Sequence, residues 1–259
     1  MKLGLLGKGI SHSLSPFIYR HWLNQYKKPG SYRLYPFEAI TKQEILALEL
    51  DGLNITMPFK KDVVSFLDQK DSLVEKIKAA NTLLIDKGVL RGTNTDATGF
   101  KRLIEPFLPL KSAVILGAGG VSLSTIWALS ESGVKDIRVV AGGNENVCMK
   151  DLPVTVWPRL KINELTRNCD IFINATPCGM KGGPEPLALP SLPHYCLVVD
   201  WVYHPYKTEL LIEAKKNNCQ TIDGLQLLLS QAQDSFFFWF GIYPDITTQL
   251  RRELCKLLD

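Results

Sequence analysis

Apolar runs and amphipathic stretches alternate along the chain, which predicts a protein built from both strands and helices. Residues 2–7 and 53–55 are short apolar runs bounded by glycine or a turn, as is typical of buried strands. Residues 17–23 carry apolar side chains at helical spacing after Ser15-Pro16, a common helix start. Capping-box sequences predict helix starts at 41–44 and 72–75, and further strands are expected at 32–37, 81–86 and 89–93, the last two joined by Lys87-Gly88.

The second half of the chain has the strand–helix alternation that favours a parallel sheet with right-handed crossovers. An apolar run at 111–116 leads into a glycine-rich turn, and a helical pattern covers 123–129. Five consecutive aromatic residues at 236–240, in the last helices, indicate core or interdomain packing. The remaining strands are expected at 137–140, 153–156, 171–174, 197–200 and 221–222, with a helix at 207–217.

The composition is ordinary for a globular protein and excludes several function classes. The chain has 259 residues, enough for one large or two ordinary domains, and 46% of them are hydrophobic. Its net charge of +4 fits small anionic ligands and is too weak to indicate nucleic-acid binding. No signal peptide or membrane-length apolar run is visible. The six cysteines form no CxxC pair and no metal-like group with the four histidines, so we expect free buried thiols in a reducing cytosol and no metal site.

A lysine and an aspartate that follow two predicted strands form the first candidate site. Lys60 ends the stretch Asn54-Ile55-Thr56-Met57-Pro58-Phe59-Lys60, which predicts a strand followed by a helix that begins at Pro58 and buries apolar residues of 63–67. Asp96 ends Gly92-Thr93-Asn94-Thr95-Asp96 and precedes another helical pattern. If both strands belong to one parallel region, the two side chains reach one cleft. Taken alone, Lys60 reads as a solvated surface lysine and Asp96 as a helix N-cap.

Two further polar stretches lie at predicted element ends. Ser11-His12-Ser13-Leu14-Ser15 leads into a helix N-terminus, where hydroxyl groups and free N–H groups make a site for an anion. Asn81 stands where a helix gives way to a strand. Capping of the local backbone is the alternative role for a single serine or asparagine at such places.

The glycine-rich turn after the strand at 111–116 predicts a dinucleotide site. In Gly117-Ala118-Gly119-Gly120-Val121-Ser122, Gly117 makes the tight turn and Gly119 lets the backbone approach a pyrophosphate. Ser122 is small enough for the helix to pack on the strand. Asn174-Ala175-Thr176-Pro177 and Asp200-Trp201-Val202-Tyr203 follow two later strands, where parallel sheets bind ligands.

Taken in order, these stretches resemble the shikimate dehydrogenase family, and the resemblance runs nearly end to end. It implies an α/β fold with a substrate-binding catalytic domain, residues 1–98 and 225–259, and a Rossmann-type dinucleotide-binding domain, residues 99–224. It also implies a cytoplasmic oxidoreductase that interconverts 3-dehydroshikimate and shikimate with NADP in aromatic amino-acid (chorismate) biosynthesis, as a monomer or homodimer. The carriers of the resemblance are Ser13-Leu14-Ser15-Pro16, the stretches ending at Lys60 and Asp96, Ala80-Asn81-Thr82, the glycine turn, 174–177, Tyr203 with Pro205 and Thr208, and 224–231.

The resemblance also assigns roles to individual residues. Lys60 is implied as the acid–base residue, paired with Asp96, and Ser13 with Ser15 as the ligands of the substrate carboxylate. A lysine ammonium beside the reacting oxygen stabilises the negative charge that develops on it and supplies its proton. The other implied substrate-binding residues are Thr56, Asn81, Tyr203 and Gln231, and the implied cofactor-binding residues are Gly117, Ala118, Gly119, Gly120, Val121, Asn174, Ala175, Thr176, Trp201 and Gly224.

The chain departs from the family pattern after its second Rossmann strand. The family usually has Asn-Arg-Thr there, and the arginine contacts the 2′-phosphate of NADP, whereas this chain has Ala141-Gly142-Gly143. Leu227 replaces a common methionine with little change in volume. A quinate/shikimate dehydrogenase that uses NAD and a non-catalytic binding protein are therefore the alternatives. The presence of both Lys60 and Asp96 argues against the second, because a binding-only site needs no proton donor.

Overall fold

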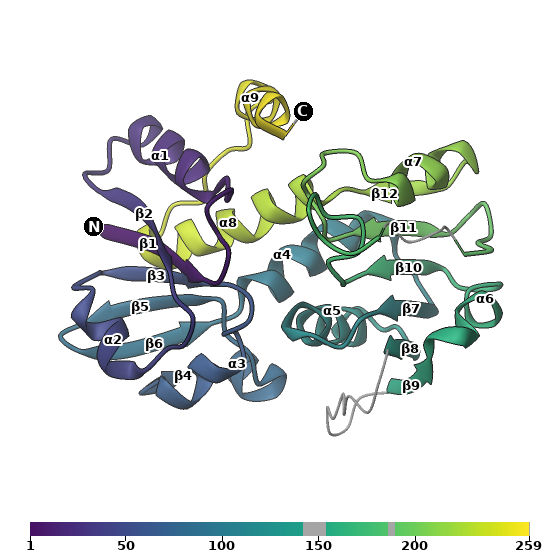
Figure 1. Ribbon diagram of the computed structural model, residues 1–259, viewed down its shortest axis with the longest axis horizontal. Helices are drawn as coiled ribbons and strands as arrows, with labels where there is room; N and C mark the ends of the chain where they lie inside the picture. The colour runs from purple at the N-terminus through teal and green to yellow at the C-terminus, as the bar shows by residue number, and fades with distance from the viewer. Residues whose placement is uncertain (142–153, 186–189, 259) are drawn as a thin grey trace. The chain divides into compact units, whose positions relative to one another are not determined.

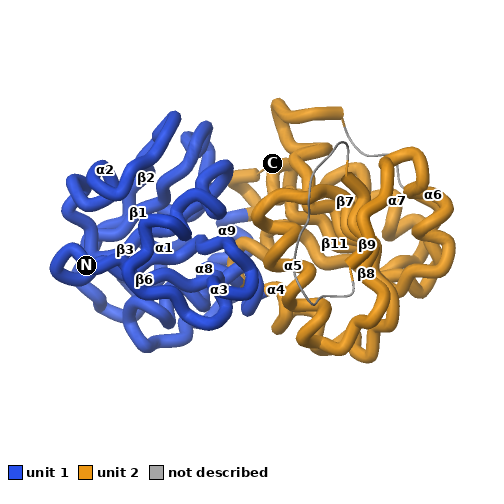
Figure 2. Tube along the Cα trace, turned by 90° about the horizontal axis from the view of Figure 1, so that it is seen from below, with its two compact units in different colours: residues 1–99, 231–254 blue, residues 100–230, 255–259 orange. Residues whose placement is uncertain are grey.

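The structure is a computed structural model that describes residues 1–141, 154–185 and 190–258 (Figure 1). The chain forms two compact units (Figure 2). Unit 1 comprises Met1–Gly99 and Gln231–Leu254, and unit 2 comprises Phe100–Ser230 and Cys255–Asp259. Residues 225–230 and 255–259, which the sequence analysis places in the first domain, group with unit 2.

Unit 1 contains a mixed sheet with the strand order β2-β1-β3-β5-β6-β4. β1 pairs in parallel with β2 and β3, whereas β5 runs antiparallel between β3 and β6. β3 and β6 are both antiparallel to β5, so their carboxyl ends lie at the same edge of the sheet. The two strands therefore belong to a mixed sheet and not to the parallel region that was expected, but their ends still share one edge. The strands are β1 (Lys2–Gly7), β2 (Ser31–Pro36), β3 (Gly52–Ile55), β4 (Gln69–Lys70), β5 (Thr82–Asp86) and β6 (Val89–Thr93).

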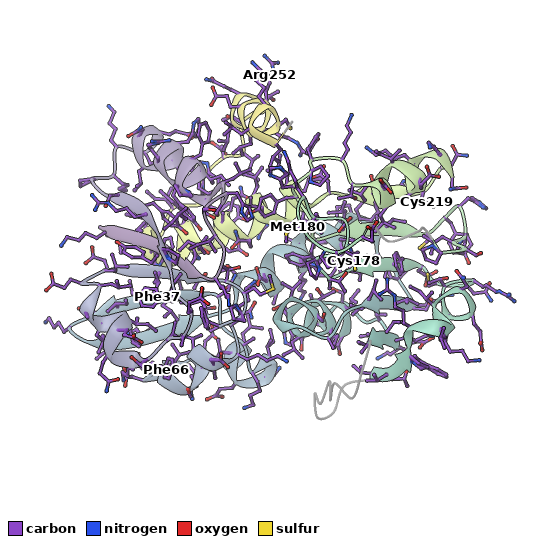
Figure 3. All side chains as sticks on the ribbon, viewed as in Figure 1. Phe37, Phe66, Cys178, Met180, Cys219 and Arg252 are labelled. Atoms are coloured by element: carbon purple, nitrogen blue, oxygen red, sulfur yellow. The ribbon has the colours of Figure 1, made fainter. Side chains whose placement is uncertain are left out.

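Helices cover both faces of the unit 1 sheet. Ile45, Val63 and Val74 pack on one face from α2 (Lys42–Ala47), the 3-10 helix η1 (Asp62–Phe66) and α3 (Ser72–Ile77). Phe37 and Phe66, labelled in Figure 3, are partly buried against the same cluster. The other face meets α1 (Ser15–Gln25) and the unit 1 part of α8 (Gly224–Phe240), which bury the aromatic side chains Tyr19, Trp22, Phe236 and Trp239. Tyr19 stacks on Tyr32 of β2 with ring centroids 4.2 Å apart.

The segment after β3 differs from its prediction. Residues 57–61 form turns, and only the five-residue η1 follows, instead of an α-helix from Pro58. Phe59 and Val63 are buried on the sheet, but the backbone becomes extended at Leu67 because the next residues pair as β4 with β6. Lys60 therefore lies in a turn, still just beyond the end of β3.

Two helix starts are also corrected, and one is confirmed. Ser15 is the first residue of α1 and not its cap, since the flanking residue is Leu14. Asp71 caps α3 by accepting a hydrogen bond from Val74 N–H, so Ser72 is the first helical residue. The capping box at Thr41 and Glu44 of α2 is present as predicted. The Lys87-Gly88 hairpin turn is also present, with positive φ at both residues.

Unit 2 contains a sheet with the order β12-β11-β10-β7-β8-β9, in which every neighbouring pair among the described strands is parallel. This is the doubly wound Rossmann order, and the strand order reverses between β7 and β10. The parallel sheet and its dinucleotide-type topology are confirmed. The strands are β7 (Ser112–Leu116), β8 (Asp136–Ala141), β9 (Val154–Pro158), β10 (Ile171–Asn174), β11 (Leu197–Asp200) and β12 (Gln220–Ile222).

The remaining helices of the described chain connect the unit 2 strands or lead between the units. The second half of α4, from Phe100, and α5 pack on one face of the sheet, through residues such as Ile104, Ile126 and Leu129. Leu210, Leu211 and Ala214 of α7 pack on the other face. The elements are α4 (Thr95–Ile104), η2 (Glu105–Phe107), α5 (Gly120–Glu131), η3 (Arg159–Lys161), α6 (Ile162–Leu165), α7 (Glu209–Lys216) and α9 (Thr248–Leu258).

The cysteines follow their prediction in part. The five in the described residues are free, and Cys169, Cys196 and Cys219 are buried. Cys178, labelled in Figure 3, and Cys255 are only half-buried, contrary to the expectation of buried thiols, and Cys148 lies outside the described residues. Within the described ranges, no helix is long and apolar enough to span a membrane, and no three His, Cys, Asp or Glu side chains are grouped to hold a metal ion.

Candidate active site

A buried ion pair joins the two strand ends at the shared edge of the unit 1 sheet. Lys60 Nζ donates to Asp96 Oδ2 at 2.6 Å, and the two side chains are only 13% and 4% exposed. Lys60 is thus not a solvated surface lysine, in contrast with its exposed neighbour Lys61. Asp96 is not the helix cap either, because the Asn94 side chain accepts the hydrogen bond from Ala97 N–H at 3.1 Å. Because Asn94 is the cap, the Asp96 carboxylate accepts the hydrogen bond from Lys60 instead.

Backbone hydrogen bonds fix the turn that carries Lys60. Thr56 N–H donates to Leu6 O at 2.9 Å, and Lys8 N–H donates to Met57 O at 3.0 Å. Lys60 O accepts from Ala80 N–H at 2.8 Å, which connects the turn to the segment before β5. The lysine is therefore held at both sides by neighbouring strand ends and not by a helix of its own.

Asn81 lies beside the ion pair and orders the start of α4. Its Oδ1 accepts from Thr95 N–H at 2.7 Å, and its Nδ2 donates to Thr95 Oγ1 at 3.0 Å. Asn81 is 2% exposed, so these bonds offset much of the cost of burying its amide. One of its two amide hydrogens has no partner in the described residues, which leaves a donor next to Thr95 and Asp96.

A chain of polar contacts connects this region to the two serines at the start of α1. Ser13 Oγ donates to Ser15 Oγ at 3.2 Å and accepts from Ser15 N–H at 3.3 Å. Burial raises the pKa of Tyr32 well above its ordinary value of 10.0, and a hydrogen bond with Ser15 opposes part of that rise. Tyr32 Oη in turn donates to Asn54 Oδ1 at 2.7 Å, and Asn54 Nδ2 donates to Asn81 O at 3.2 Å.

Thr56 follows β3 and packs against the end of β1. A Cβ atom at Gly7 would lie 2.3 Å from Thr56 Cγ2 and 3.2 Å from Met57 O, so only glycine leaves room there. Gln231, the last unit 1 candidate, begins the unit 1 part of α8, and its carbonyl oxygen accepts from Ser235 Oγ at 3.1 Å. Unit 1 thus holds seven of the eight candidate substrate residues, and Tyr203 belongs to unit 2.

The unit 2 candidates gather where the strand order reverses. Gly117 follows β7 with φ +108°, and a Cβ there would approach Thr176 Cγ2 at 2.9 Å and Ala175 O at 3.0 Å. Asn174 Oδ1 accepts from both Thr176 N–H and Thr176 Oγ1, at 3.1 and 2.6 Å, which shapes the turn after β10. The crevice beyond such a reversal is where doubly wound sheets bind ligands.

A buried carboxylate organises the neighbouring turn. Asp200, at the end of β11, accepts from Asn174 Nδ2, Val202 N–H and Thr208 Oγ1 at 2.9, 3.0 and 2.6 Å. Burial raises its pKa from 3.8 to about 6, and these three hydrogen bonds oppose the rise. A Cβ at Gly224 would meet Val202 O at 2.3 Å and Tyr203 N at 2.7 Å, so Gly224 holds the Tyr203 backbone closely. Trp201, the last candidate here, is half-buried with its ring tilted against Phe100.

The geometry of the glycine turn fits a dinucleotide. Gly119 is exposed, and a Cβ added to it would meet no atom within 4 Å, so the space in front of the turn is open. Gly119 is the N-cap of α5 and offers no side-chain cap, so the first N–H groups of that helix, at Gly120 and Val121, are not bonded by a cap side chain and suit an anion such as a pyrophosphate. Ala118 packs partly against the sheet core below. The expectation for Gly142 and Gly143 concerns positions outside the described residues, and Ala141 ends β8.

Sequence reasoning missed several polar residues that the structure places around the candidates. Asn94 is one, although an asparagine just before a helical pattern is a recognised cap signal. Thr82, Thr95 and Ser235 are the others, and all three are buried with mutually bonded hydroxyls. Thr82 and Thr95 stand in the stretches that resemble the family, but no sequence signal assigns a role to their hydroxyls or to that of Ser235, because serine and threonine read as surface residues until the packing is known.

Comparisons with known proteins give a consistent family. Residues 5–83 match the model of the shikimate dehydrogenase substrate binding domain. The chain is 37% identical to a shikimate dehydrogenase (NADP(+)) of Mesorhizobium japonicum, over 96% of this chain and 94% of that one. It is 34% identical to the enzyme of that name from Pyrococcus abyssi, over 98% and 97%.

Solved structures agree over the whole length. A quinate dehydrogenase from Corynebacterium glutamicum in complex with NAD has a TM-score of 0.88 at 30% identity, covering 99% of both chains. A shikimate 5-dehydrogenase from Thermus thermophilus, in complex with NADP(H) and shikimate, has a TM-score of 0.84 at 30% identity, covering 99% of this chain and 98% of that chain.

Proposed function

Because this chain belongs to the shikimate dehydrogenase family, we propose that it catalyses the reversible, NADP-dependent oxidation of shikimate to 3-dehydroshikimate. The observation that carries the proposal is the buried pair of Lys60 and Asp96 at one edge of the unit 1 sheet. A paired lysine in a shielded position suits proton transfer to and from a substrate oxygen. The reaction belongs to chorismate and aromatic amino-acid biosynthesis, and a cytoplasmic location accompanies it.

Lys60 acts as the general acid and base in this proposal. In the oxidation, the substrate hydroxyl gives its proton to the neutral Lys60 amine while the carbon loses its hydrogen with the bonding electrons. The oxidised form of NADP, when bound, would supply the two-electron acceptor for that step. In the reverse direction, the Lys60 ammonium stabilises the charge on the carbonyl oxygen and returns the proton. Asp96, at 2.6 Å, orients the lysine and stabilises its charged form.

The other unit 1 residues bind the substrate in this proposal. Ser13 and Ser15 hold its carboxylate at the start of α1, where hydroxyl and N–H groups favour an anion. Asn81 donates its remaining amide hydrogen to a substrate hydroxyl, and Thr56 and Gln231 contribute further polar contacts. Tyr203 is proposed to contact the carboxylate or the hydroxyls of the substrate. The proposed domains are residues 1–98 with 225–259 and residues 99–224.

In unit 2, Gly117–Val121 would hold the pyrophosphate of NADP, beside Asn174, Ala175 and Thr176. Trp201 and Gly224 would adjoin the cofactor at the ends of β11 and β12. The chain has neither the acidic residue of NAD sites nor the arginine of NADP sites at positions 141–143. Loss of one charged hydrogen bond, ~1.5–3 kcal/mol, removes roughly ten- to a hundredfold of discrimination. We therefore expect NADP to be accepted with only a modest preference over NAD.

Quinate oxidation with NAD is the second candidate. The similarity to the Corynebacterium glutamicum quinate dehydrogenase and the missing 2′-phosphate arginine favour it, whereas the paired serines at 13 and 15 favour shikimate. The test is a matrix of initial rates with shikimate or quinate and NADP or NAD, followed by cofactor absorbance. Shikimate should give the larger kcat/KM with both cofactors. A larger value for quinate would establish the second candidate, and a several-hundredfold preference for NADP would refute the argument from 141–143.

A further inference from the structure

One serine on α8 joins the elements that carry the candidate substrate residues of unit 1. Ser235 is 0% exposed, and its Oγ lies 3.1 Å from Asn54 Nδ2, 2.8 Å from Thr82 Oγ1 and 3.0 Å from Thr95 Oγ1. These partners belong to β3, β5 and the first residue of α4. The same hydroxyl reaches Gln231 O, one helical turn earlier, at 3.1 Å.

Packing alone does not account for this serine. A helical serine commonly bonds only its own i−4 carbonyl, and alanine fills a fully buried position without a polar group to satisfy. Here four partners lie within hydrogen-bond distance of the hydroxyl, and its one hydrogen and two lone pairs serve three of them at a time, with further hydrogens supplied by the Asn54 amide and the threonine hydroxyls. Ser132 provides the contrast, because its buried Oγ has no partner in the described part of the chain.

The partners of Ser235 lead directly to the candidate catalytic groups. Thr95 precedes Asp96, and Thr95 is bonded to the Asn81 side chain through both N–H and Oγ1. Thr82 Oγ1 also contacts Thr95 Oγ1 at 3.1 Å. A second hydrogen bond also joins α4 to α8, since Thr98, one turn along α4, donates to the Asp234 carboxylate of α8. The helix that carries Gln231 is thus fixed against the helix start that carries Asp96.

We propose that Ser235 is a positioning residue for shikimate oxidation. Its hydroxyl sets the register of α8 against the first turn of α4, and so places Gln231 relative to Asp96 and Asn81. The proposal rests on the proposed function, since it concerns the geometry of that same site. It adds a buried residue that touches neither substrate nor cofactor.

A double-mutant cycle tests the proposal. Ser235→Ala should lower kcat/KM for shikimate about 10-fold in the wild-type background but less than about 2-fold in a Gln231→Ala background, as expected for groups within one hydrogen-bonded network. The loss should lie mainly in KM for shikimate, with KM for NADP unchanged. Ser132→Ala, which removes a buried hydroxyl without a partner, should leave both constants unchanged.

The alternatives give different results. An equal loss of kcat/KM in both backgrounds, or a lowered melting temperature with unchanged KM for shikimate, would overturn the positioning role and leave a structural one. If Ser235→Ala does not fold, the isosteric Thr82→Val variant removes the 2.8 Å contact and should raise KM for shikimate in the same direction. Unchanged kinetics of that variant would also overturn the proposal. A wild-type protein that does not oxidise shikimate would overturn the proposed function first.

Discussion

Gly7 should control substrate affinity through the Thr56 side chain. In a Gly7→Ala variant, the new methyl group would lie 2.3 Å from Thr56 Cγ2, more than an ångström inside ordinary contact, and 3.0 Å from Ile10 Cγ2. Gly7 is the last residue of β1, and its neighbour Lys8 is bonded to Met57 O, so the strand end has little freedom to retreat. The Thr56 side chain must therefore move.

The size of the effect follows from the loss of the Thr56 contact with the substrate. A neutral hydrogen bond contributes about 0.5–1.5 kcal/mol, and since about 1.4 kcal/mol is a factor of ten, KM for shikimate should rise roughly 2- to 12-fold. The change in kcat should be smaller, because Thr56 is proposed to contact the substrate in both ground and transition states. Steady-state kinetics with saturating NADP measure both constants.

A second substitution sharpens the Gly7 experiment. Thr56→Ser removes the Cγ2 atom that collides and keeps the hydroxyl, so Gly7→Ala/Thr56→Ser should recover most of the lost affinity. Gly4→Ala is the matched control, because Gly4 lies on the same strand as Gly7. Its new methyl group would approach the Tyr35 ring of β2 at 2.4 Å and not the Thr56 side chain. It should lower stability without raising KM for shikimate. A raised KM in Gly4→Ala, or no recovery in the double variant, would refute the reasoning.

A further prediction concerns pH. Burial raises the pKa of Asp200 from 3.8 to about 6, so its contribution to stability is present below pH 3.8 and is lost as pH rises through about 6. The unfolding free energy of wild type relative to Asp200→Asn should therefore fall by ~2 kcal/mol between about pH 4 and pH 7, and a constant difference in denaturant titrations would contradict this.

The strands of both sheets could be predicted from sequence where they are continuous apolar runs. β1, β10 and β11 have the expected bounds, because their residues are buried on both faces and the flanking turns are marked by glycine, proline or polar residues. β4 and α6 were missed, since two or four residues give no measurable periodicity. The Lys87-Gly88 turn predicts the antiparallel pairing of β5 with β6, but the antiparallel pairing of β5 with β3 was beyond the sequence, because it is decided by tertiary contacts.

The residues of the candidate site could likewise be predicted only in part. Lys60 and Asp96 could be proposed from their places after two strands, but their partnership depends on the sheet order that brings those strand ends to one edge. The turn at Lys60 could not be foreseen, because β4 pairing ends the expected helix early. Ser235 gave no signal, and Thr82 stood in a family stretch without an assigned role, since their hydroxyls acquire a role only when α8 packs on the sheet. The roles of all these residues in binding and catalysis are still predictions.

The most direct test of the account is the initial rate of shikimate oxidation by Lys60→Met, measured beside wild type and Lys61→Met. Methionine keeps the apolar stem of Lys60 and removes the amine, and Lys61 is its exposed neighbour in the same turn. With saturating NADP, Lys60→Met should lower kcat by ~10²–10⁴-fold with a much smaller change in KM. Lys61→Met should match wild type. A Lys60→Met enzyme with near-normal kcat, or a wild-type protein that reduces no cofactor in the presence of shikimate, would contradict the account.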